Sequence, residues 1–192
     1  MAGIFTYNTA TAAAASLPVF FIALKILLMK RAGVRAVRFG ERDKKDFLLI
    51  PCMVFFYYLI FAETFGLPLF GSRVFYRYYV HWYGSAVCFI GALFIISAVA
   101  ASGRSFRIGL DESVPARLIT KGPYAINRNP VYSGFLLIFA GCFITFANWV
   151  FLIYLFAGFF MIHRQVLLEE KSMRKLFGAE YDEYCSRVGR YF

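Results

Sequence analysis

Charge is scarce in this sequence: only 17% of its 192 residues are Asp, Glu, Lys or Arg, against about a quarter in an ordinary soluble domain. It has two histidines, and its four cysteines form no CxxC motif, so we predict neither a metal site nor a disulfide framework. Hydrophobic residues instead make up 60% of the chain and aromatic residues 20%. So short a chain cannot bury that much apolar surface in its own interior, so we expect lipid to cover the remainder and residues 1–192 to form a single membrane domain.

Long apolar runs divide the sequence into five candidate transmembrane helices. A bilayer core about 30 Å thick takes roughly 20 apolar residues per helix. The runs cover residues 10–29, 47–62, 81–101, 131–146 and 149–162. Because only Ala147 and Asn148 separate the last two, we expect these to form a helical hairpin. The predicted fold class is an all-α integral membrane protein of about five transmembrane helices with a helical C-terminal extension.

The basic residues gather in three of the segments between these runs. Residues 30–46, 102–130 and 163–192 hold 18 of the 21 Lys and Arg residues, whereas residues 63–79 hold two. By the positive-inside rule, five spans place the N-terminus outside and the C-terminal extension in the cytoplasm; four spans would divide the basic segments between the two sides. The net charge of +10 then reflects orientation and attraction to the headgroups of membrane lipids, and we expect no nucleic-acid partner.

Residues 105–134 combine a turn with the start of a helix. The sequence Lys121-Gly-Pro-Tyr124 is typical of a turn. Asn129 precedes Pro130 and is expected to be extended, and Pro130 suits the first turn of a helix. Arg128 and Asn129 would thereby lie at a helix N-terminus, where unpaired N–H groups attract anions. An ordinary helix start explains the same residues, and the pattern alone does not choose between them.

Residues 163–184 are expected to continue the last membrane helix beyond the bilayer. Glycine is favoured just past a helix end, so we expect this helix to stop near Gly178. Gln165 and Glu169 share one of its faces at helical spacing. Charged groups at the edge of a bilayer either are solvated or form part of a polar site, and both interpretations remain open on the residues alone.

Four motifs lie in these two segments in a fixed order. They are Gly122-Pro-Tyr124, Arg128-Asn-Pro-x-Tyr-x-Gly134, the pair Glu169-Glu170, and Phe177-Gly-x-Glu-Tyr-x-x-Tyr184. As a set, over residues 117–190, they resemble the isoprenylcysteine carboxyl methyltransferases and their membrane methyltransferase relatives. The short length and the five spans resemble prokaryotic-type members, so we expect a prokaryotic cell membrane as the location, or the endoplasmic reticulum membrane if the source is eukaryotic.

The resemblance implies a methyltransferase that uses S-adenosylmethionine (SAM) and releases S-adenosylhomocysteine, with its cofactor on the cytoplasmic side in about residues 103–192. The implied cofactor contacts are Leu118, Ile119, Gly122, Tyr124, Asn129, Pro130, Tyr132, His163 and Glu169. Asn129 stands where relatives usually have His, and Gln165 stands where they place an Arg that contacts the substrate. Glu169, Arg164 and Arg128 are the expected catalytic residues, and which of His163, Arg164, Gln165 or Arg128 meets the substrate carboxylate stays open.

The acceptor that the resemblance implies is the C-terminal carboxylate of an isoprenylated cysteine, or a similar lipid-tailed group. A terminal carboxylate has a pKa of about 3.5 and needs no general base, whereas a phospholipid amine, the rival acceptor, would need a proton acceptor. A small transporter or scaffold is the non-enzymatic alternative, but Lys25, Glu63 and His81 lie at helix ends rather than at the midplane, where a transport pathway would need them. No span contains GxxxG, so we expect a monomer.

Overall fold

The computed structural model describes residues 2–32, 49–75, 78–103 and 118–191. Its regular elements in these ranges are α1 (Ala2–Arg31), α2 (Leu49–Phe65), α3 (Tyr78–Ala101), the 3₁₀ helix η3 (Gly122–Ala125), α4 (Pro130–Phe146), α5 (Trp149–Phe177) and α6 (Ala179–Arg187). Each of the five predicted runs lies within or largely within a helix. The all-α architecture, the hairpin of α4 and α5, and the helical C-terminal extension are therefore confirmed.

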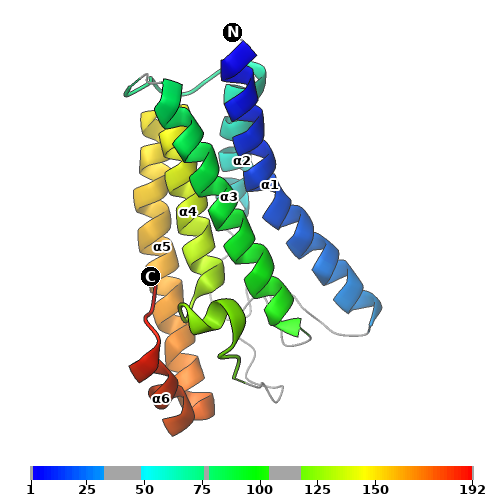
Figure 1. The fold of residues 1–192 in the computed structure, drawn as a ribbon, viewed down its shortest axis with the longest axis vertical. Helices are drawn as coiled ribbons and strands as arrows, with labels where there is room; N and C mark the ends of the chain where they lie inside the picture. Colours follow the sequence, from blue (N-terminus) through cyan, green and yellow to red (C-terminus); the bar gives the residue numbers. More distant parts are fainter. Residues whose placement is uncertain (1, 33–48, 76–77, 104–117, 192) are drawn as a thin grey trace.

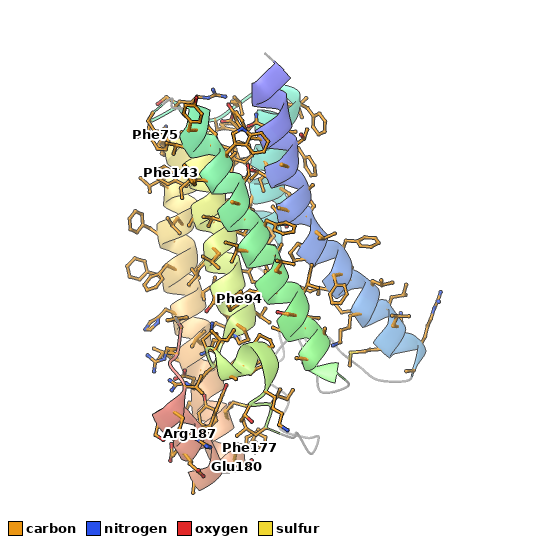
Figure 2. All side chains as sticks on the ribbon, viewed as in Figure 1. Phe75, Phe94, Phe143, Phe177, Glu180 and Arg187 are labelled. Carbon is orange, nitrogen blue, oxygen red and sulfur yellow. The ribbon has the colours of Figure 1, made fainter. Side chains whose placement is uncertain are left out.

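Figure 1 shows α1 to α5 packed lengthwise into an elongated bundle, with α6 folded back against the end of α5. By length and composition, α1, α3 and α5 can each cross a membrane, and α2 and α4 are shorter apolar helices. Side chains project from the outside of the bundle along its length (Figure 2), and many of the large apolar ones are exposed: Phe20 is 68% exposed and Phe160 is 69% exposed. So much exposed apolar surface is typical of a protein whose outer face contacts lipid.

The two ends of the bundle differ in what they carry. The C-terminal ends of α1 and α3, the N-terminal end of α4 and the whole of α6 lie at one end, and the N-terminus lies at the other (Figure 1). The basic segments predicted to share one side of the membrane therefore begin or end at the same end of the bundle. Residues 33–48 and 104–117, which belong to these segments, lie outside the described residues.

Four glycines let α3 and α4 approach closely. A β-carbon on Gly84 would lie 2.7 Å from the carbonyl oxygen of Gly141, and one on Gly91 would lie 2.6 Å from the carbonyl oxygen of Gly134. The two glycines of each helix are seven residues apart, so they lie on one face and meet their partners in antiparallel order. Small residues at such an interface allow membrane helices to pack backbone against backbone. This contact fixes the position of α4, whose first turn carries the candidate site.

Replacing Gly91 with leucine is expected to force α3 and α4 apart. Overpacking a helix contact costs about 1–3 kcal/mol, which lowers Tm by about 2–4 °C per kcal/mol for a chain of this size. Thermal unfolding in detergent measures the effect. Leu93→Phe is the matched control, because Leu93 is 50% exposed on the same helix and an added ring there meets only lipid. An equal loss of Tm in both variants would contradict the packing account.

The charged groups at the helix ends tie helices together. At the end opposite α6, the Glu63 carboxylate pairs with Arg73 at 3.2 Å and accepts a hydrogen bond from Asn148 Nδ2 at 3.2 Å. This links α2 and the connection after it to the turn between α4 and α5. At the other end Lys25 Nζ donates to the Val99 carbonyl oxygen near the end of α3. Glu63 and Lys25 thus each join neighbouring helices at an end of the bundle. Such a structural role does not favour a transport pathway.

Candidate functional site

The two adjacent glutamates of α5 face different neighbours. Glu169 accepts one hydrogen bond from the Tyr132 hydroxyl of α4 and another from Gln165 Nε2 at 3.3 Å. Burial, and to a smaller extent the Glu169 charge, raises the pKa of Tyr124 to about 12, so the phenol and the carboxylate interact electrostatically. We call Tyr124, Tyr132, Gln165 and Glu169 the Glu169 cluster. Burial raises the pKa of Glu169, and the hydrogen bonds from Tyr132 and Gln165 oppose that shift. Within the described residues the hydrogen-bond donors of the cluster are neutral, so its one acid has no cationic partner there.

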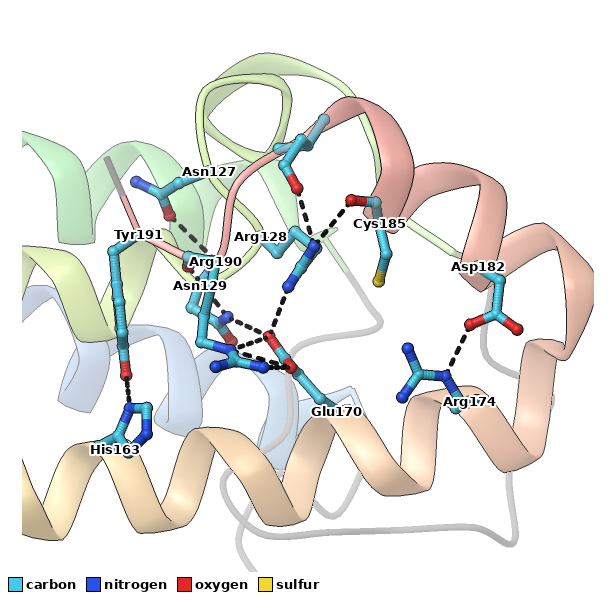
Figure 3. Close-up of polar contacts among 11 residues, drawn as sticks. Asn127, Arg128, Asn129, His163, Glu170, Arg174, Asp182, Cys185, Arg190 and Tyr191 are labelled. Atoms are coloured by element: carbon cyan, nitrogen blue, oxygen red, sulfur yellow. Dashed lines mark hydrogen bonds and ion pairs between the residues drawn. The ribbon is translucent and has the colours of Figure 1, made fainter.

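Glu170 lies at the centre of a second, strongly charged cluster (Figure 3). Its Oε2 is 2.9 Å from Arg190 Nη2, and its Oε1 is 3.2 Å from both Arg128 Nη2 and Asn129 Nδ2. The Glu170 side chain is 8% exposed and that of Arg128 is 11% exposed. We call Arg128, Asn129, Glu170 and Arg190 the Glu170 cluster. Its two guanidinium groups more than neutralise the one carboxylate, so the two clusters have opposite net charge.

The first turn of α4 positions residues of both clusters. Pro130 takes the N1 position as predicted, and Gly122 in the preceding turn has a φ of +65°, which requires glycine. Asn129 was expected to be extended, but its φ of −128° and ψ of 54° place it outside that region. Its backbone N–H donates to Asn127 Oδ1 at 3.0 Å while its side chain bonds Glu170, and these two bonds bend the residue. The Asn129 side chain consequently does not cap α4.

The helix α5 ends at Phe177, close to the predicted Gly178, and α6 then folds back against it. Gly178 follows α5 with a φ of +50°, which lets the chain reverse. Tyr184 of α6 then donates a hydrogen bond to the Tyr124 carbonyl oxygen at 2.6 Å. Buried Leu118 packs against Tyr181 and Tyr184. These contacts hold the turn around η3, and with it Tyr124, against the C-terminal helix.

Arg128 is bonded on both of its Nη atoms. Besides the bond to Glu170, its Nη1 donates to the carbonyl oxygens of Cys185 at 3.0 Å and Val188 at 2.8 Å. Its buried Nε is the one atom of the guanidinium group without a hydrogen-bond partner in the described part of the chain. Arg128 therefore holds the start of α4 to the end of α6.

Some of the predicted site residues belong to the Glu169 cluster, some belong to the Glu170 cluster, and the others lie outside both clusters. Tyr124, Tyr132 and Glu169 meet in the Glu169 cluster, and Arg128 and Asn129 belong to the Glu170 cluster. The remaining predicted residues are Leu118, buried below α6; Ile119, half-buried; Pro130, buried; and Gly122 and Arg164, exposed. His163 stacks on Phe159 with ring centroids 5.8 Å apart, and its Nδ1 lies 3.1 Å from the Tyr191 hydroxyl.

Sequence reasoning did not identify Glu170 or Arg190 as parts of the site. Glu170 was recognised only as half of a motif pair, and Arg190 lies 20 residues further along the chain with no motif around it. The one available signal was that these two adjacent glutamates are the only acidic residues of α5. No three His, Cys, Asp or Glu side chains come together as metal ligands in the described ranges.

The long apolar helices and the exposed apolar surface of the bundle define a helical membrane protein. Within that class the chain belongs to the phospholipid methyltransferase family, whose model matches residues 79–180, just over half of the sequence. The match covers α3, η3, α4 and α5, and it ends at the start of α6. It therefore includes every residue of the Glu169 cluster.

The chain is also similar to curated relatives whose names agree with the resemblance. A rice protein (Oryza sativa subsp. indica) named probable protein-S-isoprenylcysteine O-methyltransferase is 32% identical over 117 residues, which cover 58% of this chain and 60% of the relative. A Tribolium castaneum protein named protein-S-isoprenylcysteine O-methyltransferase is 28% identical over 175 residues, which cover 88% of this chain and 58% of the relative. The chain thus spans about three-fifths of the length of these relatives, and the resemblance read from its motifs is confirmed.

Proposed function

We propose that this protein is a SAM-dependent methyltransferase that methylates the C-terminal carboxylate of an isoprenylated cysteine at the inner face of a membrane. The observation that carries the proposal is the environment of Glu169. This acid lies between α4 and α5 with hydrogen bonds from Tyr132 and Gln165, which are neutral. A half-buried carboxylate whose donors are all neutral is suited to bind a cationic group.

The proposed topology has five spans, α1 to α5, with the N-terminus outside and the site in the cytoplasmic half of the chain. A helix rises 1.5 Å per residue, so about 20 residues of α5 cross a hydrocarbon core of roughly 30 Å. Counted from Trp149, the first residue of α5, that length reaches the region of Glu169. The Glu169 cluster would then lie at the level of the inner headgroups, where a substrate with its tail in the bilayer presents its polar end.

The chemistry of the Glu169 cluster fits SAM. When bound, SAM supplies a methyl group on a sulfonium centre. The Glu169 carboxylate would hold its ammonium or ribose hydroxyl groups, and the rings of Tyr124 and Tyr132 would line the site. Burial and the Glu169 charge raise the pKa of Tyr124 to about 12, so at neutral pH this phenol stays protonated and acts as a donor rather than a base. Since a carboxylate acceptor is already ionised, no base is needed.

The acceptor carboxylate requires a cation, and both Arg128 and Arg190 already bond Glu170. Arg164 is exposed on α5 one residue before Gln165, the position at which relatives carry an Arg. We assign Arg164 to the acceptor carboxylate, since its planar fork matches two carboxylate oxygens. Arg128 contributes by holding the start of α4 to Glu170 and to the end of α6.

Replacing Arg164 with glutamine is expected to raise the KM for the prenylated acceptor by about tenfold or more, the effect of losing a charged hydrogen bond. The Kd for S-adenosylhomocysteine should stay unchanged, because Arg164 is not part of the Glu169 cluster. Initial-rate kinetics with each substrate varied in turn separate the two constants. Lys171→Gln, an exposed charge further along α5, is the control. An unchanged acceptor KM would remove Arg164 from the site.

The acceptor itself is tested by offering two candidates to the same preparation. Full-length protein in lipid nanodiscs is incubated with methyl-labelled SAM, N-acetyl-farnesylcysteine and phosphatidylethanolamine. The proposal predicts label in the prenylated cysteine as a base-labile methyl ester. Label in the phospholipid headgroup would favour the activity after which the matched family is named, and absence of SAM binding would favour a non-enzymatic membrane protein.

A further inference from the structure

The residues that follow α6 in the described part of the chain return along the bundle and contact the start of α4 and the side of α5. These residues, 188–191, are here named the C-terminal strap. Figure 1 shows them rising from α6 alongside α5 toward the middle of the bundle. The strap is fixed to the start of α4 by its backbone: the carbonyl oxygen of Gly189 accepts from the Arg128 N–H at 2.9 Å, and that of Val188 accepts from Arg128 Nη1 at 2.8 Å.

Arg190 joins the strap to α5 and α4 at once. Its Nε and Nη2 bond both carboxylate oxygens of Glu170 at 2.9–3.1 Å, and its carbonyl oxygen accepts from Asn129 Nδ2 at 3.2 Å. A two-pronged contact of this kind fixes the orientation of a carboxylate as well as its position. The Arg190 side chain is 38% exposed while Glu170 is 8% exposed, so Arg190 covers the solvent side of the Glu170 cluster.

The end of the strap reaches the membrane part of α5. The Tyr191 hydroxyl lies 3.1 Å from His163 Nδ1, and the two rings are 6.1 Å apart. Figure 3 shows Tyr191 and Arg190 side by side above α5, with His163 and Glu170 below them. The strap therefore bridges the first turn of α4 and about two turns of α5.

The residues that the strap holds are chain neighbours of the Glu169 cluster. Glu170 follows Glu169 directly, and Asn129 precedes Tyr132 by three residues across the first turn of α4. The hydrogen bond between Tyr132 and Glu169 spans α4 and α5, as do the bonds that Arg190 makes. Moving the strap away would loosen the joint between these two helices and with it the spacing of Tyr132 and Glu169.

We infer that Arg190 is a positioning residue and that docking of the C-terminal strap is coupled to binding of the cofactor. This inference rests on the proposed function, since the cofactor is the one assigned there. The docked strap holds α4 and α5 at the spacing that the Glu169 cluster needs, and a ligand that contacts both helices at this cluster stabilises the docked strap in return. Coupling between two sites is necessarily reciprocal. The effect of the strap on ligand affinity and the effect of the ligand on strap docking can therefore be measured separately.

Arg190→Gln is the first test, with S-adenosylhomocysteine as the probe in calorimetry. The Kd is expected to rise by about tenfold, as for loss of a charged hydrogen bond, and Arg190→Lys is expected to recover part of the loss. Arg187→Gln is the matched control, because Arg187 is 68% exposed and pairs with Glu183 on the same helix. Hydrogen exchange of amides 186–191 should slow when wild-type protein is saturated with S-adenosylhomocysteine and should be fast in Arg190→Gln.

The outcomes separate this inference from the proposed function. Wild-type protein that does not bind S-adenosylhomocysteine overturns the proposed function. Wild-type protein that binds it, with an equal Kd in Arg190→Gln and no protection of residues 186–191, overturns the coupling alone. If Arg190→Gln fails to fold, Tyr191→Phe removes only the hydroxyl that contacts His163: a Kd raised by about threefold with unchanged Tm supports the coupling, and an unchanged Kd overturns it.

Discussion

Replacing Glu169 with glutamine is expected to weaken binding of S-adenosylhomocysteine by about tenfold to hundredfold, the range for losing a hydrogen bond to a charged group. The substitution keeps the shape of the side chain and its hydrogen bond from Tyr132, and it removes the negative charge of the Glu169 cluster. Isothermal calorimetry in nanodiscs gives the Kd. The Tm of the ligand-free protein should change little, because no cation among the described residues pairs with Glu169.

Glu180→Gln is the control for this variant. Glu180 lies in the first turn of α6 and is exposed, so removing its charge changes the total charge of the protein by the same amount without entering the site. The Kd of Glu180→Gln should match the wild type. If both variants bind S-adenosylhomocysteine with wild-type affinity, Glu169 is not a cofactor residue.

Replacing Glu170 with glutamine should instead destabilise the fold. The change leaves Arg128, 11% exposed, and Arg190 without their shared carboxylate. Removing one partner of a buried pair costs about 3–5 kcal/mol, and the lower end applies here because Arg190 is partly solvated. At about 2–4 °C per kcal/mol, Tm should fall by roughly 6–12 °C.

Glu169 and Glu170 are thus expected to have different roles, the first in ligand binding and the second in stability. Glu169→Gln should lose ligand affinity with its Tm preserved, and Glu170→Gln should lose Tm. Thermal unfolding and calorimetry on the same two preparations measure both quantities. A Glu170→Gln variant with wild-type Tm and no ligand binding would reverse the assignment of the two glutamates.

The positions of the helices could be predicted closely because each of the helices α1 to α5 coincides with a long run of apolar residues. The run predicted at 131–146 is α4 from Pro130 to Phe146, and the hairpin turn after it lies where Ala147 and Asn148 were expected. The exception is α1, which begins at Ala2 rather than near residue 10. Its first turns include polar Asn8, whose side chain donates to the Glu63 carbonyl oxygen at 2.9 Å. That contact with α2 is a tertiary one, which hydropathy along α1 does not reveal.

The site could be predicted only where its residues lie in motifs. Tyr132 and Glu169 lie in separate motifs and are joined by a hydrogen bond, and their role as cofactor residues stays a prediction. The partner of Glu170 depends on the reversal at Gly178, which brings residues 188–191 back to α5. Such a long-range pairing leaves no periodic signal in the sequence, so Arg190 could not be distinguished from the other basic residues of the C-terminal segment.

The measurement that tests the site most directly is a structure of the protein with S-adenosylhomocysteine bound. We expect the ligand beside Tyr124, Tyr132 and Glu169, with the Glu169 carboxylate within hydrogen-bond distance of it. Glu170 should remain bonded to Arg128 and Arg190, with the C-terminal strap docked. A ligand bound elsewhere in the bundle, or one contacting Glu170 while Glu169 faces away, would contradict the account.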